Sequence, residues 1–403
     1  MGEQIARESV QLTRQDGQRL GSLIVDPRGT ELLAVAGDLP CEFATDHPGA
    51  YGPLIAAGVL VPSSGSLRTP TISVVIPARN PPPDSFATLV GNLVASPWVD
   101  EVIVVDDASQ SPIDIDIDGI VIVRNTVSLG PGAARNLGAQ KSTNEVLLFI
   151  DADIVSIDEE LFSLLKLLTN HQIVALAPRV IEEGHLSPLD LGPSPTMVDG
   201  KHLNHLPGAV LAIDRRHFEA VGGFGEDLRL GEDVDLINRL RHPDHLVIYA
   251  PNSVCVHHHQ PLFTRLIKTA TYGYSVGHLR RRTDLTLIPQ LRDAPSLAWV
   301  VFAPFTTATL AALNLTNHLS KRLARSQQIK ASILLLDRQF LANASLIVRQ
   351  LGLPMALSSL VSGHLRRSFT AALIIEVLHQ GITATLYDLA YSIGLWLSIG
   401  LEN

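Results

Sequence analysis

The chain has 403 residues, 46% of them hydrophobic, and a formal net charge of -9. This length allows two or three domains with sizeable cores. The acidic balance argues against a nucleic-acid partner, because proteins of that class usually carry a basic surface. The mean hydropathy of +0.22 is high for a soluble enzyme. Most of the apolar excess lies in the last hundred residues, which predicts contact with a membrane surface.

The N-terminal region, residues 1–70, alternates short apolar runs with turns and predicts a small domain. Within it, two short strands are expected on either side of a turn at Pro27 to Gly29. The stretch from Pro62 to Pro70 is rich in Pro, Ser and Gly, which is typical of a linker.

Two features indicate the compartment. Cys41 and Cys255 are too few and too far apart for a disulfide framework or a zinc site, so a reducing, cytoplasmic setting is expected. Residues 1–17 are polar and lack the apolar core of a signal peptide. We therefore expect the catalytic part of the chain to remain on the cytoplasmic side.

Residues 71–261 contain short apolar stretches spaced as in a βαβ series. Continuous apolar strands of this kind are typical of a mostly parallel sheet with helices on both faces, and predict an α/β fold. In such a fold, ligands bind beyond the carboxyl ends of the strands. The stretches are "ISVVIP", "EVIVVDD", "GIVIVRN", "EVLLFIDAD" and "IVALAPRV".

Two acidic pairs follow strands of this series. Asp106 and Asp107 end the second, and Asp151 and Asp153 follow the fourth, so all four are expected on one rim of the sheet. Several acidic groups there suit a divalent cation, and a cation with oxygen ligands suits a phosphorylated substrate. Neither a P-loop motif nor a convincing dinucleotide-binding motif is present, which argues against an NTPase or an NAD enzyme.

A third acidic run, Asp114, Asp116 and Asp118, precedes a strand and is expected at the opposite end of the sheet or in a loop. We interpret this run as a solvated turn.

The segment "GPGAARN" predicts a turn at Gly130 and Gly132, followed by a helix that carries Arg135 and Asn136 in its first turns. Such a helix start suits an anion, and Arg135 would pair with a phosphate or with the carboxylates of "DAD". The alternative is that the glycines only make a tight turn and Arg135 forms a surface ion pair.

Farther along, Glu232 and Asp233 open a predicted amphipathic helix. They either cap the helix or provide a general base facing a metal-bound substrate. His257 ends a later strand and is a candidate metal ligand, whereas His258 and His259 are expected in a solvated loop.

From residue 262 to 403 the chain is predicted to be helical and apolar. Residues 296–317 have no charged side chain and are long enough for a membrane span, although an interfacial helix and a core helix remain open. Basic residues flank this segment, at 280–282 and at 321–325, as expected near anionic lipid. We favour attachment to one membrane surface over a span.

In order and spacing, the motifs between residues 73 and 240 resemble the inverting glycosyltransferases of family 2, which have a GT-A fold. The resemblance implies a nucleotide-sugar donor, an Mg²⁺ or Mn²⁺ ion, and no covalent intermediate. The motifs are "SVVIPARN", "VIVVDDAS", "GPGAARNLGA", "LLFIDADI" and "GGFGEDLRLGEDVDLINRL".

The resemblance also implies roles for particular residues. Asp233 matches the acceptor base, with Glu232 beside it. Asp153 and His257 match metal ligands, and Asp151 lies beside the sugar. The remaining positions would bind the donor nucleotide, and they are Pro77, Ala78, Arg79, Asp106, Asp107, Gly132, Arg135 and Asn136.

A closer resemblance covers nearly the whole chain and points to the mycofactocin-system branch of this family. It rests on "LIAAGVLVP", "HHHQPLFTRLIKTATYGYSVGHLRRR" and "TATLYDLAYSIGLWLSIGLEN". The N-terminal region also resembles PqqD-like peptide-binding modules. The resemblance implies UDP-glucose as donor and premycofactocin, a small peptide-derived redox cofactor, as acceptor. The helical tail is shorter here than in those relatives.

Two alternatives share the same motifs. One is a rhamnosyl or mannosyl transferase of cell-envelope assembly, and the other is a nucleotide-sugar sensor at the membrane that catalyses nothing.

Overall fold

A computed structural model describes most of the chain between Arg68 and Leu279, and residues 344–400. The described ranges are 68–169, 173–182, 184, 187, 189–192, 205–242, 245–279 and 344–400, with the backbone of five short strands before residue 63. The chain divides into two compact units, Glu42–Gln260 and Met1–Cys41 with Pro261–Asn403. The predicted apolar segment 296–317 and its basic flanks lie outside the described residues. The division into domains 1–70, 71–261 and 262–403 stays a prediction.

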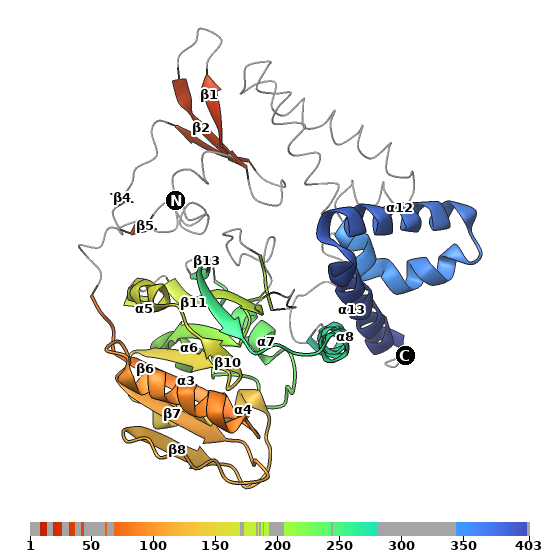
Figure 1. Cartoon of the computed structure of the whole chain (residues 1–403). Coiled ribbons are helices and arrows are strands. Elements are labelled where there is room, and N and C mark those ends of the chain that lie inside the picture. Colours follow the sequence, from red (N-terminus) through yellow and green to blue (C-terminus); the bar gives the residue numbers. More distant parts are fainter. Residues whose placement is uncertain are drawn as a thin grey trace. The chain divides into compact units, whose positions relative to one another are not determined.

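The first unit, Glu42–Gln260, is built on an eight-stranded sheet (Figure 1). All five apolar stretches predicted as strands form strands of this sheet. In order across the sheet the strands are β10 (Ile154–Ser156), β13 (Leu246–His257), β11 (Ile173–Glu182), β12 (Val210–Asp214), β9 (Val146–Ile150), β6 (Ile72–Ala78), β7 (Glu101–Asp106) and β8 (Ile120–Arg124).

The sheet is mixed, so the expectation of a mostly parallel sheet is corrected. β12 runs antiparallel to both of its neighbours, β11 and β9, and β10 runs antiparallel to β13. The other neighbouring pairs are parallel. All five residues of β12 are buried, and a fully buried strand has the same apolar sequence in either direction. The reversal places the start of β12 at the rim where the parallel strands end.

Helices cover both faces of the sheet because alternate strand residues point to opposite sides. Val74, Val104 and Leu148 face one side, where they pack with α3 (Pro83–Ala95), α5 (Glu159–Leu164) and the 3₁₀ helix Leu165–Thr169. Val75, Val105 and Phe149 face the other side, which is covered by α4 (Pro131–Lys141), α6 (Arg215–Ala220) and α7 (Glu232–Leu240). This two-sided core accounts for the continuous apolar strands of the sequence.

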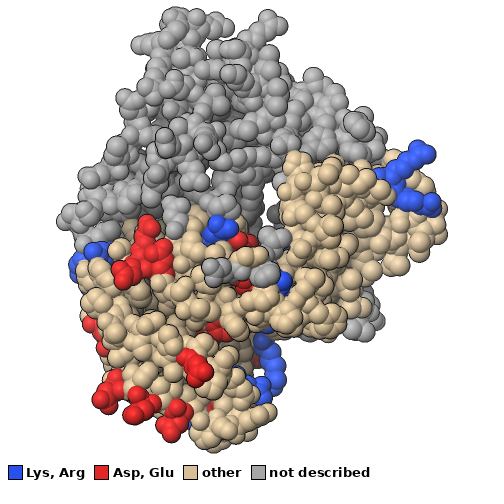
Figure 2. All heavy atoms as spheres, in the orientation of Figure 1, with Lys and Arg blue, Asp and Glu red and all other residues tan. Residues whose placement is uncertain are grey.

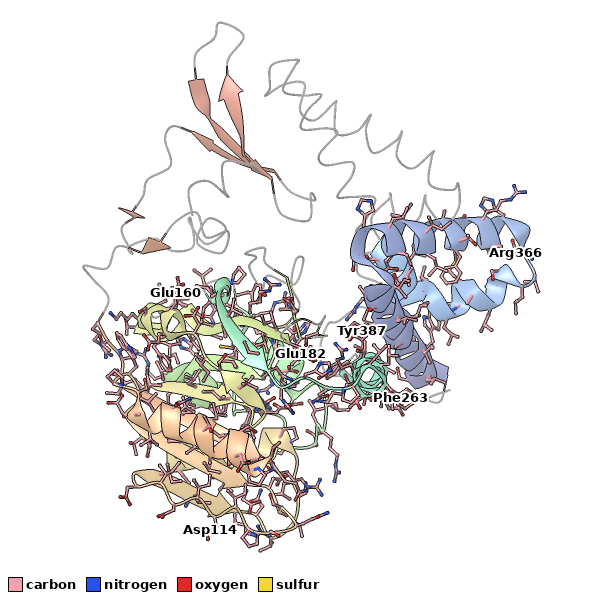
Figure 3. All side chains as sticks on the ribbon, in the orientation of Figure 1. Asp114, Glu160, Glu182, Phe263, Arg366 and Tyr387 are labelled. Atoms are coloured by element: carbon pink, nitrogen blue, oxygen red, sulfur yellow. The ribbon has the colours of Figure 1, made fainter. Side chains whose placement is uncertain are left out.

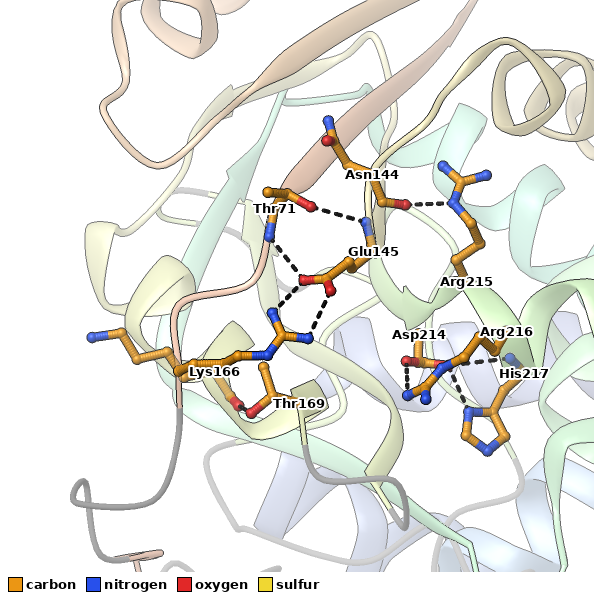
Figure 4. Close-up of polar contacts among 10 residues, drawn as sticks. Thr71, Asn144, Glu145, Lys166, Thr169, Asp214, Arg215, Arg216 and His217 are labelled. Atoms are coloured by element: carbon orange, nitrogen blue, oxygen red, sulfur yellow. Dashed lines mark hydrogen bonds and ion pairs between the residues drawn. The ribbon is translucent and has the colours of Figure 1, made fainter.

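The rim opposite the acidic residues is held by a polar network (Figure 4). Arg68 makes two hydrogen bonds to the carboxylate of Glu145, at 2.5 and 2.6 Å, and Thr71 exchanges hydrogen bonds with Glu145. Asp214 accepts from Arg216 and from the backbone N–H of His217, which caps α6. These contacts fix the starts of β6 and β9 and the end of β12.

The second unit contains the predicted helices. They are α8 (Leu262–Leu279), a helix at 344–359, α12 (Gly363–Gln380) and α13 (Ile382–Gly400). The backbones of α8 and α13 approach closely, because a Cβ at Gly394 would lie 1.8 Å from the carbonyl oxygen of Ala270, and one at Gly273 would lie 2.1 Å from that of Tyr391. Only glycine fits at such a crossing.

The N-terminal part of this unit forms a three-stranded sheet, with β1 (Ser9–Thr13), β2 (Arg19–Val25) and β3 (Leu32–Ala36) in antiparallel order. The two strands predicted around Pro27 to Gly29 are therefore confirmed. Two further short strands, β4 (Glu42–Phe43) and β5 (Val61–Pro62), pair in parallel.

The packing of α4 on the sheet predicts a large difference between two helical glycines. A Cβ at Gly138 would lie 2.3 Å from Cγ1 of Val75, whereas a Cβ at Gly91 in α3 would make an ordinary contact of 3.8 Å. We expect Gly138→Ala to lower the free energy of unfolding by about 1–3 kcal/mol through overpacking. Gly91→Ala, the matched control, should be neutral or stabilise by roughly 0.5–1 kcal/mol, since alanine favours a helix. Urea unfolding followed by circular dichroism measures both, and equal effects would contradict this account of the α4 packing.

Candidate active site

The predicted acidic residues gather at one rim of the sheet. Asp106 is the last residue of β7, Asp151 directly follows β9, and His257 is the last residue of β13. The backbone N–H of Asp151 donates to the carbonyl of Ala209, just before β12. The parallel strands end at the rim where the antiparallel strand β12 begins. This arrangement brings residues from distant parts of the sequence together.

Asp153 and His257 form the pair predicted to bind metal. Nε2 of His257 lies 2.9 Å from Oδ2 of Asp153, and Nδ1 of His257 lies 2.8 Å from the carbonyl oxygen of His258. If Nδ1 carries the proton of a neutral ring, it donates to that carbonyl, and the Nε2 lone pair then faces a carboxylate oxygen. Two acceptors at this distance require a cation or an extra proton between them. A histidine that donates its other N–H to a backbone carbonyl is the usual arrangement of a metal ligand.

Glu182 is a residue of this rim that the sequence analysis missed. It ends β11 in register with His257 of the parallel strand β13 and is only 4% exposed. Its Oε2 lies 3.4 Å from Nδ1 of His259 and accepts from the backbone N–H of Gln260 at 3.3 Å. Glu182 therefore holds the turn after His257. The same pattern that identified Asp106, an acidic residue at the end of an apolar run, would have found it.

Arg135 links the two acidic groups of the rim. Its Nη2 lies 2.6 Å from Oδ1 of Asp151 and its Nη1 lies 2.8 Å from Oε1 of Glu232. The side chain is 3% exposed, and Nη2 also donates to the carbonyl of Gly208 at 3.3 Å. The predicted pairing with the "DAD" carboxylates is confirmed for Asp151, and the alternative of a surface ion pair is wrong.

One guanidinium does not fully compensate the carboxylates around it. The pKa of Glu232 is raised to about 7, chiefly by burial and then by the charge of Asp233, while Arg135 opposes the change. Burial likewise raises the pKa of Asp151, with Arg135 lowering it and the charge of Asp153 raising it. Glu232 is held by Arg135 and is mostly inaccessible, which makes it a poor acceptor base.

Asp233 is placed differently from Glu232. It is half-buried, its Oδ2 accepts the backbone N–H of Gly208 at 3.0 Å, and its Oδ1 accepts the N–H of Val234 at 2.8 Å. Gly231, with φ 79°, occupies the N-cap position of α7, so Asp233 does not cap the helix. Its carboxylate is oriented by backbone groups and retains free lone pairs, as a general base requires.

Asp106 and Asp107 are both buried and bind loops of the rim. Asp107 accepts four hydrogen bonds of 2.8–3.0 Å, from Asn125, Ser128 and the backbone N–H groups of Leu129 and Gly130. Burial raises the pKa of Asp107, but these donors outweigh it, and the net pKa is lowered. The carboxylate thus fixes the loop that leads into α4.

Asp106 accepts from the backbone of Ser109 and Ile113 and pairs with Arg124 of β8. Burial raises its pKa, and these partners together lower it. For Asp106 and Asp107 alike, contact with the nucleoside stays a prediction.

The other predicted donor-binding residues lie on the same side. Pro77 and Ala78 end β6, and Arg79 follows them with an exposed side chain. Asn136 is buried, and its amide exchanges hydrogen bonds of 2.9 Å with the backbone of Phe224. A Cβ at Gly132 would lie 3.3 Å from the Cβ of Phe224. Gly132 and Asn136 therefore join α4 to the loop before α7, and their contact with donor stays a prediction.

The run of alternating aspartates lies in the loop between β7 and β8. Asp114, Asp116 and Asp118 are exposed, while the isoleucines between them pack against the core. Figure 3 shows Asp114 at the edge of the domain, well away from Glu182. The interpretation as a solvated turn is confirmed.

Residues 73–202 match the family model described as "Glycosyl transferase family 2". The chain therefore contains a family 2 glycosyltransferase domain. It is similar to the pre-mycofactocin glycosyltransferase of Mycobacterium tuberculosis, with 28% identity over 392 residues that cover 85% of this chain and 82% of that protein.

Among solved structures, this glycosyltransferase is similar to the mannosyltransferase PcManGT of Pyrobaculum calidifontis in complex with GDP-Man and Mn²⁺. The TM-score is 0.49, with 16% identity, 87% of this chain and 96% of that chain covered. It is also similar to the glucosyl-3-phosphoglycerate synthase of Mycobacterium tuberculosis in complex with Mn²⁺, UDP and phosphoglyceric acid, with a TM-score of 0.39 and 21% identity over 53% of this chain and 78% of that one.

The raised pKa of Glu232 predicts a pH dependence of stability. A carboxyl whose pKa is about 7 when folded and about 4.5 when unfolded contributes stability that is fully present below pH 4.5. That contribution is lost as the pH rises toward 7, because only the folded state then keeps the proton. We expect Glu232→Gln to reduce this fall in the free energy of unfolding between pH 4.5 and 7. Urea unfolding at a series of pH values measures it, with the exposed Glu219→Gln as the control. An unchanged slope in Glu232→Gln would contradict the pKa assignment.

Proposed function

We propose that this family 2 glycosyltransferase moves glucose from UDP-glucose to premycofactocin or its glucosylated forms, with inversion at the anomeric carbon. The site geometry supports a transferase that acts on a nucleotide sugar, because a candidate cation pair and an oriented carboxylate share one rim. The choice of acceptor rests on the pre-mycofactocin glycosyltransferase, whose similarity extends over most of both chains. The choice of UDP-glucose rests on the same resemblance.

Asp153 and His257 would hold an Mg²⁺ or Mn²⁺ ion. Among the described residues no group of three or more His, Cys, Asp or Glu is arranged around one point. A site with two protein ligands fits Mg²⁺ chemistry, in which substrate phosphates and water complete the coordination shell. When bound, the ion would offset the charge that develops on the leaving diphosphate.

Two further described residues, Asp233 and Arg135, have separate roles in the reaction. Asp233 takes the proton of the attacking acceptor hydroxyl, and the Gly208 N–H keeps its carboxylate in place. Arg135 keeps Asp151 and Glu232 in fixed positions. Since attack and departure take place on opposite faces of the sugar, the anomeric configuration inverts.

The protein would work at the cytoplasmic face of the cell membrane.

The metal assignment and the donor are tested together. We expect purified protein to turn over UDP-glucose in the presence of Mn²⁺ or Mg²⁺ and the peptide-derived acceptor, and to lose activity when the ion is chelated. Asp153→Asn should reduce turnover by at least about 10²-fold, since it weakens the ligand that faces His257.

Asp116→Asn is the matched control, because it removes the same charge from an exposed position in the loop between β7 and β8. Its turnover should be normal. Equal losses at the two positions would contradict the metal assignment, and faster turnover of GDP-mannose or of a rhamnose donor would replace the proposed substrate.

The role of Asp233 is tested by Asp233→Asn. The asparagine oxygen can still accept the Gly208 N–H, so the fold should be retained, with a change of about 0.3–1 kcal/mol from the charge lost near the helix start. If Asp233 is the base, kcat should fall on the order of 10²–10⁴-fold while nucleotide affinity is kept.

Asp235→Asn removes an equal charge from the same helical turn, where it pairs with Arg239 at 2.6 Å. We expect it to lower the melting temperature and to leave kcat nearly normal. A near-normal kcat for Asp233→Asn would exclude Asp233 as the base.

A further inference from the structure

The helix α12 presents one exposed side along its whole length. Positions spaced three or four residues apart on a helix lie on the same side, and the chain then turns at Gly381 into α13. We call these exposed positions the α12 stripe, and they are Arg366, Arg367, Thr370, Ile374, Leu378 and, across the turn, Ile382.

The stripe is basic toward the start of α12 and apolar toward its end. Ile374, Leu378 and Ile382 are 53%, 76% and 67% exposed, which is unusual for side chains of this size in one contiguous row. Ser368, Ala372 and Glu376 lie on the opposite side of α12 and are fully buried. α12 is therefore anchored in its own unit by one side, and the described residues leave the stripe uncovered.

The charge of these helices is one-sided as well. In 262–279 and 344–400 the only acidic residues are Glu376 and Asp388, and both are buried. Arg366 and Arg367 are exposed, and Figure 2 shows Lys and Arg but no Asp or Glu on the visible face of these helices. Figure 3 shows Arg366 at the start of α12, on the outside of these helices. An exposed surface with only positive charges, in a chain of net charge -9, complements an anionic surface.

Lipid is the anionic partner that also accounts for the apolar half of the stripe. A helix with basic residues and large aliphatic residues on its exposed side lies in the interface of a membrane, with the aliphatic groups among the acyl chains. We propose that the α12 stripe binds the surface of a membrane that contains anionic lipids.

A surface position fits these helices better than a span. Among the described helices, one is long and apolar enough to cross a membrane, Ile382–Ile399 of α13, and 39% of it is buried within the protein. α13 carries Asp388, paired with Arg349 at 2.7 Å, and ionisable groups at the centre of a bilayer are costly. The exposed row on α12 contains two arginines, which suit lipid headgroups and not the bilayer core.

The test uses the full-length protein and vesicles. Sedimentation with phosphatidylcholine vesicles that contain 30% phosphatidylglycerol, roughly a bacterial proportion, should carry the protein into the pellet, and high salt or pure phosphatidylcholine should release much of it. Arg366→Gln with Arg367→Gln should lower the partition coefficient about 10–30-fold, since each basic residue near such a surface contributes roughly a factor of five. Leu378→Ser with Ile382→Ser should lower it on the order of tenfold or more.

Matched controls lie in the other unit. Lys141→Gln removes an exposed positive charge, and Val121→Ser removes a side chain that is 44% exposed on the edge strand β8. Both should bind vesicles as the unaltered chain does. All substituted side chains are exposed, and the hydrogen bond that Nε of Arg366 donates to the carbonyl oxygen of Ser359, at 2.9 Å, is exposed too, so melting temperatures should change little.

Unchanged vesicle binding in the stripe variants would overturn the proposal and assign the membrane contact to another segment. No binding of the unaltered chain to anionic vesicles would overturn it too. A dimer in solution that Leu378→Ser with Ile382→Ser converts to monomer would show that the stripe is covered by a second copy instead.

Discussion

The buried guanidinium of Arg135 is the interaction on which the geometry of the rim depends. It lies between a carboxylate that follows β9 and one that opens α7, at 2.6 and 2.8 Å. A buried carboxylate without a partner is costly, so neither Asp151 nor Glu232 is stable in place without this cation. Because Gly208 bonds both Arg135 and Asp233, the position of Asp233 also follows from this contact. One side chain of α4 thus fixes the position of the residues after β9 relative to those at the start of α7.

This arrangement separates two neighbouring carboxylates by environment. Glu232 is buried against the arginine and has its pKa raised to about 7, whereas Asp233 turns toward backbone donors and is partly exposed. Successive positions of a helix point in directions about 100° apart, so the two side chains diverge at the start of α7. Adjacent acidic residues in the sequence therefore serve different purposes.

The sequence predicted the strands β6, β7 and β9 and the acidic residues that follow two of them, because carboxylates at the end of an apolar run are expected where a buried strand reaches a polar rim. It predicted Arg135 beside Asp151 for a similar reason. The contact between Asp153 and His257 could be predicted only from the family resemblance, since it depends on the antiparallel pairing of β10 with β13. The antiparallel direction of β12 could not be predicted, because a fully buried strand has the same apolar sequence in either direction. Glu182 had the right pattern and was missed.

The four hydrogen bonds accepted by Asp107 change what mutagenesis at that position would measure. An asparagine there would turn an amide NH₂ toward groups that are themselves donors, the hydroxyl of Ser128 and the backbone N–H of Gly130. The loop before α4 would lose the acceptor that holds it in place, and the helix that carries Arg135 would lose its alignment. In this enzyme, a loss of activity on substitution of Asp107 would reflect the disturbed loop. The contribution of Asp107 to nucleotide recognition therefore has to be measured by changing the nucleobase of the donor and keeping the protein unaltered.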